Sequence, residues 1–461
     1  MPPAIGDDTF PRDLTITTTS TLTSDSPRFP VLLAAALLTC HLLLALALIP
    51  PWQQPDEPTH VAGVETQVSQ LLHGNGIADP GREAAILESM ARYDWWEHRR
   101  VGLKAPAVLA RTFQSMAEMG FGPVGSPVSL DQLSPYAIVA GRVLTWLPRA
   151  SVTDDLYWLR GASAILGLLT LWAAWLAARE CFDSLGAVVV PLLLALHPQF
   201  AVVSTAASPD AFVNLAGAVV WWQAASAVRR GRILPLGGMW AAAMLATAVD
   251  RMGVPLLVFG LIVSAFFGLF RTRAWKRPST VVVVLAAASG LAASAWAFSM
   301  LPETLTIPSE PISWSSFIRS SWLMFQSWWF APGWGRYTTP GWWIAAVAAL
   351  SALSIVGAAR LSFRRIEDGA MRPLVLLAAF GVVVQLAAVY VGIHLRLGVG
   401  AQGRYLMPLL VPSLVILWGG LEAWVPSPRR PYAAVTVLLL FAVLDAAAWM
   451  LVMIPAYYDS L

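Results

Sequence analysis

The chain alternates long apolar runs with short polar connections, a pattern typical of a protein that crosses a membrane many times. A helix needs about 20 apolar residues to span the hydrocarbon core of a bilayer, and eleven runs of about that length are present. They lie at 30–50, 161–179, 185–203, 210–228, 234–249, 253–270, 279–299, 341–360, 373–393, 405–424 and 432–454. A further stretch, 135–148, is too short and is interrupted by Arg142, so it predicts a helix along the membrane surface.

The charges of the connections predict the orientation. Cytoplasmic connections carry an excess of Lys and Arg. If the N-terminus is cytoplasmic and every run crosses once, the cytoplasmic connections are short and basic: Arg229–Arg232, Arg271–Arg277, Arg360–Arg365 and Arg429–Arg430. We therefore predict an all-α, multi-pass protein of the plasma membrane with about eleven transmembrane helices.

The same topology divides the chain into a tail and a membrane domain. Residues 1–29 are polar and rich in Ser, Thr and Pro, so we expect a disordered cytoplasmic tail before the membrane domain at 30–461. Two long loops, 51–160 and 300–340, then lie on the extracytoplasmic side. Loops of that length usually fold and function.

The first of these loops contains a helical pattern of its own. Val61, Val64, Val68 and Leu71 form one apolar stripe after Pro58. We expect this juxtamembrane helix to lie in the membrane interface with the stripe toward lipid.

Composition agrees with a membrane protein and argues against one class of partner. Hydrophobic residues make up 57% of the chain and charged residues 12%. The net charge is only +3, and the basic residues collect in separate short loops. No continuous basic face results, so we do not expect nucleic acid as a partner.

The first candidate for chemistry is the pair Asp56-Glu57, which follows the first apolar run. Pro58 is suited to the first turn of a helix, and the helix dipole favours ionised carboxylates at that end. An ionised, positioned carboxylate is what a general base requires. The alternative is an ordinary capped helix in a hydrated loop.

A second group of polar residues stands at the outer ends of later crossings. Ser208-Pro209-Asp210 has the composition of a helix start, and Asp210 is either part of that cap or a second acidic group facing Asp56. Arg404, at the start of the tenth crossing, is suited to a phosphate. For Arg336 and Arg396, phosphate binding and an interfacial anchor are equally good interpretations.

Dense aromatic residues characterise the stretch 326–337. Trp329 and Trp334 lie there beside Gly and Arg residues, and they could stack on a sugar or flank a lipid headgroup. The alternative is an aromatic belt at the membrane interface.

Taken together, these pieces resemble the GT-C superfamily of membrane glycosyltransferases. Within it, the chain more closely resembles the bacterial membrane proteins of the domain of unknown function 2142 family. The segments that carry the resemblance are Pro55–His60, Ser208–Ala211, Ser327–Trp334, and Gln402–Leu406 with Pro408.

The resemblance implies an inverting transfer of a sugar from a polyprenyl-phosphate donor in the membrane to a cell-envelope glycan or lipid acceptor. Asp56 would be the general base and Glu57 would orient the acceptor. Asp210 and His60 would assist the acceptor or hold a metal. The lipid phosphate would be bound by Arg404, Tyr405, Arg336 and Arg396. The substrate would be contacted by Trp329, Trp334 and Gln402.

Metal dependence stays open at this point. The Asp-X-Asp pair that some metal-dependent members carry is absent from the second outer loop. Both a reaction without metal and one assisted by Mg or Mn are therefore compatible with the sequence.

Two other functions are compatible with the pattern. A flippase or exporter of a lipid-linked or anionic substrate would place ionisable groups inside the membrane. Asp445, in the eleventh run, is the main residue of that kind. The other alternative is an inactive relative that acts as a scaffold.

Overall fold

A computed structural model of the chain describes residues 28–74, 79–99, 102–122, 134–270, 313–363, 371–394 and 400–458, and all regular structure in these ranges is helical. The predicted tail, apart from its last two residues, and the predicted crossing 279–299 lie outside the described residues. So does Arg396.

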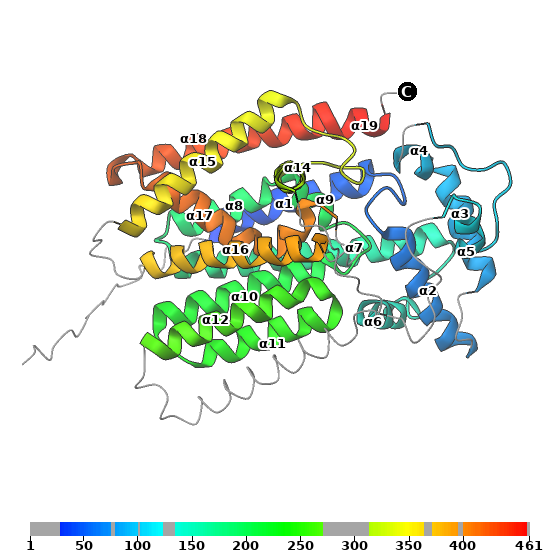
Figure 1. Cartoon of the computed structure of the whole chain (residues 1–461), viewed down its shortest axis with the longest axis horizontal. Coiled ribbons are helices and arrows are strands. Elements are labelled where there is room, and N and C mark those ends of the chain that lie inside the picture. The colour runs from blue at the N-terminus through cyan, green and yellow to red at the C-terminus, as the bar shows by residue number, and fades with distance from the viewer. Residues whose placement is uncertain are drawn as a thin grey trace, which may run out of the picture.

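The described helices fall into two groups (Figure 1). A long bundle contains α1 (Arg28–Leu48), α7 (Val152–Cys181), α8 (Gly186–Ala195), α9 (Pro198–Val203), α10 (Asp210–Arg230), α11 (Leu234–Val249), α12 (Val254–Phe270), α14 (Trp314–Trp329), α15 (Gly341–Phe363), α16 (Met371–His394), α17 (Leu410–Glu422), α18 (Arg430–Ala448) and α19 (Ile454–Tyr458). Short turns between them are η2 (Arg251–Gly253), η4 (Gly403–Leu409), η5 (Ser427–Arg429) and η6 (Trp449–Met453).

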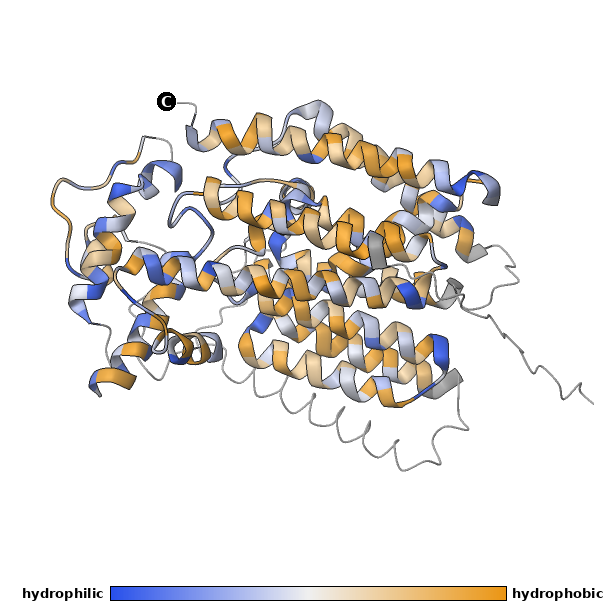
Figure 2. Ribbon diagram, turned by 180° about the vertical axis from the view of Figure 1, so that it is seen from behind, coloured by the Kyte–Doolittle hydropathy of each residue, from blue (hydrophilic) through white to orange (hydrophobic). Residues whose placement is uncertain are grey.

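A layer of shorter helices caps one end of the bundle. It consists of α2 (Glu57–His73), α3 (Pro80–Arg92), α4 (Trp95–Arg99), α5 (Phe113–Glu118) and α6 (Pro135–Leu144), and we call it the α2–α6 layer. These helices come from the predicted first loop. Figure 2 shows apolar residues along the middle of the bundle and hydrophilic residues at its ends and in the α2–α6 layer.

Seven of the described helices are long and apolar enough to cross a membrane. They correspond to predicted runs and confirm an all-α, multi-pass architecture. Three further predicted runs form shorter apolar helices, and the α6 segment is likewise short, with only ten residues. Arg230 pairs with Glu180, and Arg430 with Glu422 at 2.7 Å, at the bundle end opposite the α2–α6 layer.

The predicted boundaries differ from the observed ones at three places, each with a local cause. The run 185–203 is split into α8 and α9, because Pro198 starts a new helix that His197 caps. The helix predicted at 161–179 begins earlier, at Val152, where Ser151 caps a polar first turn. The predicted loop 300–340 contains α14, which Ser313 caps.

The expectation for the apolar stripe of α2 was wrong in its direction. The helix forms as predicted, but Val61, Val64 and Val68 are buried in the hydrophobic core of the α2–α6 layer. They pack against residues from α3, α5 and α6, such as Met90 and Phe113. The stripe faces protein because this loop folds into a layer with its own core.

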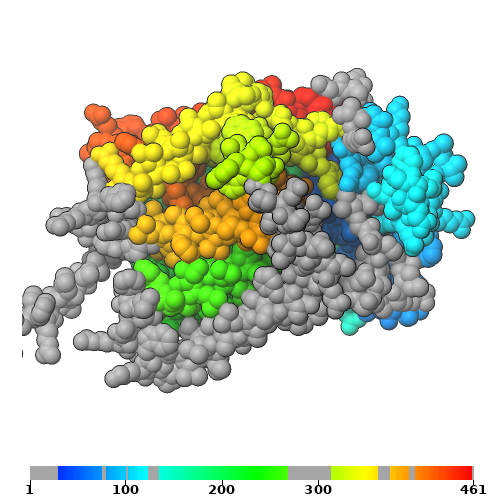
Figure 3. Space-filling view, viewed as in Figure 1, coloured from blue at the N-terminus to red at the C-terminus, as the bar shows by residue number. Residues whose placement is uncertain are grey.

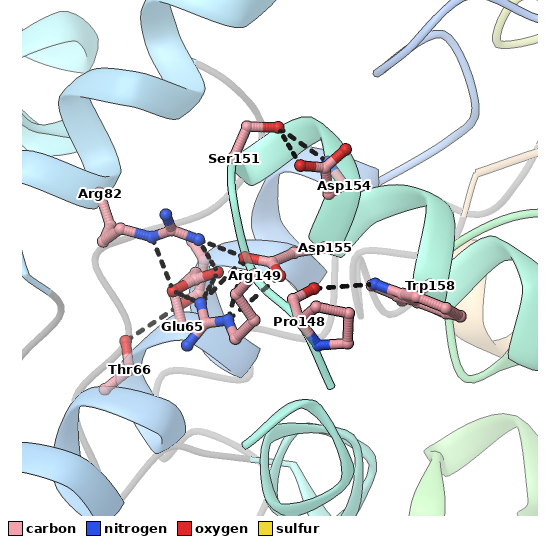
Figure 4. Close-up of polar contacts among 10 residues, drawn as sticks. Glu65, Thr66, Arg82, Pro148, Arg149, Ser151, Asp154, Asp155 and Trp158 are labelled. Carbon is pink, nitrogen blue, oxygen red and sulfur yellow. Dashed lines mark hydrogen bonds and ion pairs between the residues drawn. The ribbon is translucent and has the colours of Figure 1, made fainter. Parts of the chain in front are cut away.

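Four charged side chains clamp the α2–α6 layer to the bundle (Figure 4). Glu65 of α2 and Asp155 of α7 share Arg82 of α3 and Arg149, with Arg149 Nη2 at 2.6 Å from Glu65 Oε2. Both carboxylates are buried. Because two negative and two positive groups are fully paired, the buried charge is balanced.

Close packing between α10 and η4 brings two parts of the chain together at the capped end. A Cβ atom on Gly217 would lie 2.0 Å from the carbonyl oxygen of Pro408. Only glycine lets these two backbones approach so closely.

Because the two backbones lie so close at Gly217, we predict that Gly217→Ala lowers the free energy of unfolding by about 1–3 kcal/mol through overpacking. Thermal unfolding of the detergent-solubilised protein measures the change. Gly237→Ala is the matched control, because a Cβ atom at this helical position would meet nothing within 4 Å. The control should be neutral or stabilising, and equal losses in both variants would contradict the packing argument.

Candidate active site

The polar residues singled out in the sequence meet at the end of the bundle that carries the α2–α6 layer. Arg404, in η4, forms ion pairs with Asp56, which precedes α2, and with Asp210, the first residue of α10. The pair with Asp210 measures 3.3 Å between Nη1 and Oδ2. Asp56 and Asp210 thus share the guanidinium of Arg404, which lies 348 positions after Asp56 in the chain.

The backbone of Asp56 explains why its carboxylate reaches Arg404. Asp56 occupies the N-cap position of α2 with φ 63°, in the left-handed region, and its side chain makes no capping hydrogen bond. A non-glycine residue in this region costs of order 1 kcal/mol or more, and such residues cluster at functional sites. The side chain is 26% exposed, so a ligand can approach it.

Electrostatics keep the Asp56 carboxylate ionised. Burial by itself would raise the pKa of Asp56, but the guanidinium of Arg404 outweighs it and lowers the pKa below its ordinary value. The folded protein therefore binds a proton at Asp56 less readily than an unfolded chain does.

Arg404 retains donor capacity beyond its two carboxylate partners. The side chain is only 8% exposed, and its Nη2 also donates to the hydroxyl oxygen of Tyr405 at 3.0 Å. Its Nε has no hydrogen-bond partner among the described residues. Since a buried unpaired N–H is costly, this atom is suited to an anionic ligand.

His60 lies one helical turn after Asp56, next to further acidic groups. The charges of Asp56, Asp210 and Asp250 all act on His60, yet burial dominates and lowers its pKa. Its ring stands edge-on to Tyr136 of α6, with centroids 6.0 Å apart. The imidazole is therefore neutral near pH 7 and can accept or donate a hydrogen bond.

Glu57 lies deeper than Asp56 and has a different environment. Both of its oxygens accept from Arg160 of α7, at 2.7 and 2.8 Å, and they also accept from the backbone N–H groups of Gln54 and Ala207. Glu57 and Arg160 are fully buried. This environment leaves no free oxygen for an acceptor and favours a positioning role for Glu57 over the expected acceptor contact.

The aromatic and basic residues predicted to contact the substrate lie in two regions, one in the bundle and one against α4. Trp329 is buried against His197, with stacked rings 5.3 Å apart, and it also lines an apolar cavity. Trp334 packs instead against Trp95 of α4. Arg336 donates to the backbone carbonyl of Glu97, so it contacts α4 and is not paired with the carboxylates of the site.

An apolar cavity of about 650 Å³ lies in the bundle. It is lined by side chains of α14, α15, α16, η4 and α17, including Phe317, Tyr390, Leu406 and Leu409. Figure 3 shows α14 lying on the surface between α15 and α16. The short helix η4 contributes Leu406 and Leu409 to the cavity and Arg404 to the charged cluster, and so connects the two.

The donor set of the cluster does not match a divalent metal site in this arrangement. Among the described residues, no three His, Cys, Asp or Glu side chains come together at metal-ligand spacing. The oxygens that a cation between Asp56 and Asp210 would require are held by Arg404. We therefore derive no step through a metal.

Sequence reasoning missed Arg160 and Arg99. Arg160 stands just before the run predicted as the second crossing, and nothing in the sequence indicates its partner. Arg99 lies in a basic pair, Arg99-Arg100, on the predicted outer side, where basic residues are depleted. A basic pair on the side where basic residues are depleted was the signal that could have identified Arg99.

Asp445 is accounted for by packing within the bundle. Its carboxylate pairs with Nε2 of His41 in α1 at 2.7 Å and accepts from Trp449 Nε1 at 3.1 Å. Each oxygen of the residue on which the carrier hypothesis depended thus has a partner, one from α1 and one from the next turn of its own helix.

Comparisons with known proteins concern the fold and the superfamily. A family model described as dolichyl-phosphate-mannose-protein mannosyltransferase matches residues 151–296, about a third of the chain. The search among curated proteins found no match.

Two solved structures of the oligosaccharyltransferase of Archaeoglobus fulgidus are similar in fold, each at 14% identity. The apo form has a TM-score of 0.50 over 93% of this chain and 56% of that chain. The complex with Zn and sulfate has a TM-score of 0.51 over 91% and 53%. The chain thus spans little more than half the length of these structures.

The helical architecture is therefore a GT-C fold, and the family model that matches part of the chain is also one of membrane glycosyltransferases. The comparisons do not show the narrower resemblance to the domain of unknown function 2142 family.

The buried ion pair of Glu57 and Arg160 predicts that a single substitution at Glu57 strongly destabilises the protein. Glu57→Gln leaves the buried guanidinium of Arg160 without its counter-charge and should destabilise the protein by about 3–5 kcal/mol. Thermal unfolding in detergent measures this loss. The double substitution Glu57→Leu with Arg160→Met removes both charges, but it also removes the partners of the backbone groups of Ile49, Pro50 and Ala207. Its loss of stability should therefore be smaller than the sum of the losses of the two single substitutions, and an additive loss would contradict the assignment.

Proposed function

We propose that this protein is an inverting glycosyltransferase that moves a sugar from a polyprenyl-phosphate donor to a cell-envelope acceptor on the extracytoplasmic side of the plasma membrane. The observation that carries the proposal is that η4 contributes Arg404 to the cluster with Asp56 and Asp210, and Leu406 and Leu409 to an apolar cavity. A charged cluster and an apolar cavity that share one short helix suit a donor with a phosphate head and a hydrocarbon tail.

The isoprenoid chain of the donor occupies the apolar cavity in this proposal. Its lining is almost entirely hydrocarbon and aromatic, so burying the chain there is favoured by the hydrophobic effect. Gln385 of α16 donates to the carbonyl oxygen of Tyr405 at 2.7 Å and fixes η4 against the cavity. The phosphate then lies next to Arg404.

Arg404 exchanges partners when the donor binds. Its unpartnered Nε and its Nη2 donate to phosphate oxygens, which replace the carboxylate of Asp56. Asp210 keeps Nη1 in place during this exchange. The released carboxylate of Asp56 is then available to the acceptor, so donor binding prepares the base.

The transfer step follows from this arrangement. The acceptor hydroxyl oxygen attacks the anomeric carbon of the sugar as Asp56 takes its proton, and the bond from that carbon to the phosphate oxygen breaks. The bonding electrons stay on the phosphate, and Arg404 stabilises the charge that develops there. One displacement inverts the anomeric configuration.

The remaining expected residues take supporting roles. Glu57, held by Arg160, positions Asp56 by fixing the start of α2. His60 assists the acceptor. Trp329, Trp334 and Gln402 stay predicted substrate contacts, and Tyr405 and Arg336 stay predicted contacts of the lipid phosphate. Arg396 lies outside the described residues, and its predicted phosphate contact remains an expectation.

The central prediction is that Asp56→Asn abolishes transfer and leaves the protein folded, since the substitution removes the base but little volume. Transfer of labelled sugar from polyprenyl-phosphate donors in membranes measures it, and unfolding temperature checks the fold. Asp154→Asn, at an exposed position of α7, is the matched control and should remain active. Undiminished transfer by Asp56→Asn would reject the base assignment.

The lowered pKa of Asp56 predicts the pH dependence of kcat/KM, which reports on groups of the free enzyme. Because the folded pKa lies below its ordinary value, the carboxylate stays ionised until the pH falls through that lowered pKa. Protonation of Asp56 should therefore cause no acidic loss of kcat/KM above about pH 4. An acidic limb near pH 6 that shifts in Asp56→Glu would contradict this electrostatic assignment.

A further inference from the structure

Arg99 packs its guanidinium against two indole rings. It is the last residue of α4, and its Cζ atom is 5.0 Å from the ring centroid of Trp95 and 4.7 Å from that of Trp334. The two rings stand edge-on to each other at 6.2 Å. Cation–π attraction of this kind holds a guanidinium in place without neutralising its charge.

No acceptor of the protein satisfies Arg99 in the described part of the chain. Its Nη1 is buried and has no hydrogen-bond partner there. Burial lowers the pKa of Arg99, and the charge of Asp56 offsets part of that effect, so Asp56 lies within electrostatic range. A guanidinium remains protonated under such conditions.

The charges of two guanidiniums therefore act on the Asp56 carboxylate. Among the described residues, each guanidinium also has one buried N–H group without a hydrogen-bond partner: Nε of Arg404, which pairs directly with Asp56, and Nη1 of Arg99. Buried cationic donors without partners favour an anionic ligand.

We propose that Arg99 is a second anion-binding residue of the donor site and binds the phosphate oxygen that gains charge when the sugar leaves. This inference rests on the proposed function. It concerns a residue on α4 of the α2–α6 layer, whereas Arg404 is on η4, so the leaving group is held from two separate elements of the fold.

The change in charge during the reaction explains why a second guanidinium would help. A polyprenyl-phosphate sugar is a phosphodiester with one negative charge. When the bond between sugar and phosphate oxygen breaks, the electron pair remains on that oxygen, and the product is a phosphate monoester that is largely dianionic near pH 8. In this proposal Arg404 neutralises the single negative charge of the donor phosphate, and Arg99 neutralises the second negative charge, which appears during transfer.

The competing explanation is that Arg99 only packs the loop around Trp334. Binding of small lipid phosphates separates the two explanations without requiring catalysis. Geranylgeranyl phosphate carries the extra charge of the product, whereas its methyl ester keeps the single charge of the donor. Their affinities for the purified full chain at pH 8 can be compared by isothermal titration calorimetry.

We expect the wild type to bind the monoester about tenfold or more tightly than the methyl ester. Arg99→Gln should lose most of this preference while still binding the methyl ester. Arg99→Lys, which retains the charge, should keep a measurable part of the preference. Arg92→Gln, at an exposed position of α3, removes a charge from the same layer and should change neither affinity.

The outcomes separate this inference from the proposed function. If Arg99→Gln keeps the full preference, or if Arg99→Lys behaves like Arg99→Gln, Arg99 has only a packing role and the inference is wrong. If the folded wild type binds neither lipid, the polyprenyl-phosphate donor is wrong, and the role of Arg99 fails with it.

Discussion

A buried ion pair between Glu57 and Arg160 joins the segments that build the site. Arg160 also donates to the carbonyl oxygens of Ile49 and Pro50, and Glu57 accepts from the N–H of Ala207. The end of α1, the start of α2, the first turns of α7 and the loop before α10 are thereby fixed to one another. Desolvating two charges is costly, and only a fully paired geometry offsets that cost. Asp56 and Asp210 are each within a few residues of this junction.

The site next to this junction combines incomplete pairing with local strain. Asp56 and Trp334 both have left-handed backbones, with φ 63° each, and Trp52 has φ 71°. Rigid surroundings have to maintain such conformations. The clamp of Glu65, Arg82, Arg149 and Asp155 supplies part of that rigidity, because it holds α2 and α3 against α7. Stable ion pairs thus surround a cluster whose guanidiniums retain N–H groups without a hydrogen-bond partner among the described residues.

The position of the cluster also accounts for how one site could serve a lipid and a polar acceptor. The apolar cavity and Arg404 share η4, while Asp56 and His60 belong to the start of α2 in the α2–α6 layer. A charged group in the hydrocarbon region would be costly, and the end of the bundle avoids that cost. In the proposed function, an acceptor hydroxyl outside the hydrocarbon region meets a membrane-bound donor at this boundary.

The sequence by itself determined the all-α membrane architecture, since a bilayer requires helices with about 20 apolar residues and confines charge to their ends. It also identified Asp56, Asp210 and Arg404, because ionised groups beside apolar runs stand out in a chain with few charges. It could not predict which charges pair. Glu57 resembles Asp56 in the sequence, yet its partner Arg160 is 103 residues away. The tertiary structure decided which face of α2 is buried, where the helix splits at Pro198, and that Arg99 packs against two indole rings. These features depend on contacts between distant segments, and neither local propensity nor hydrophobic periodicity carries information about such contacts.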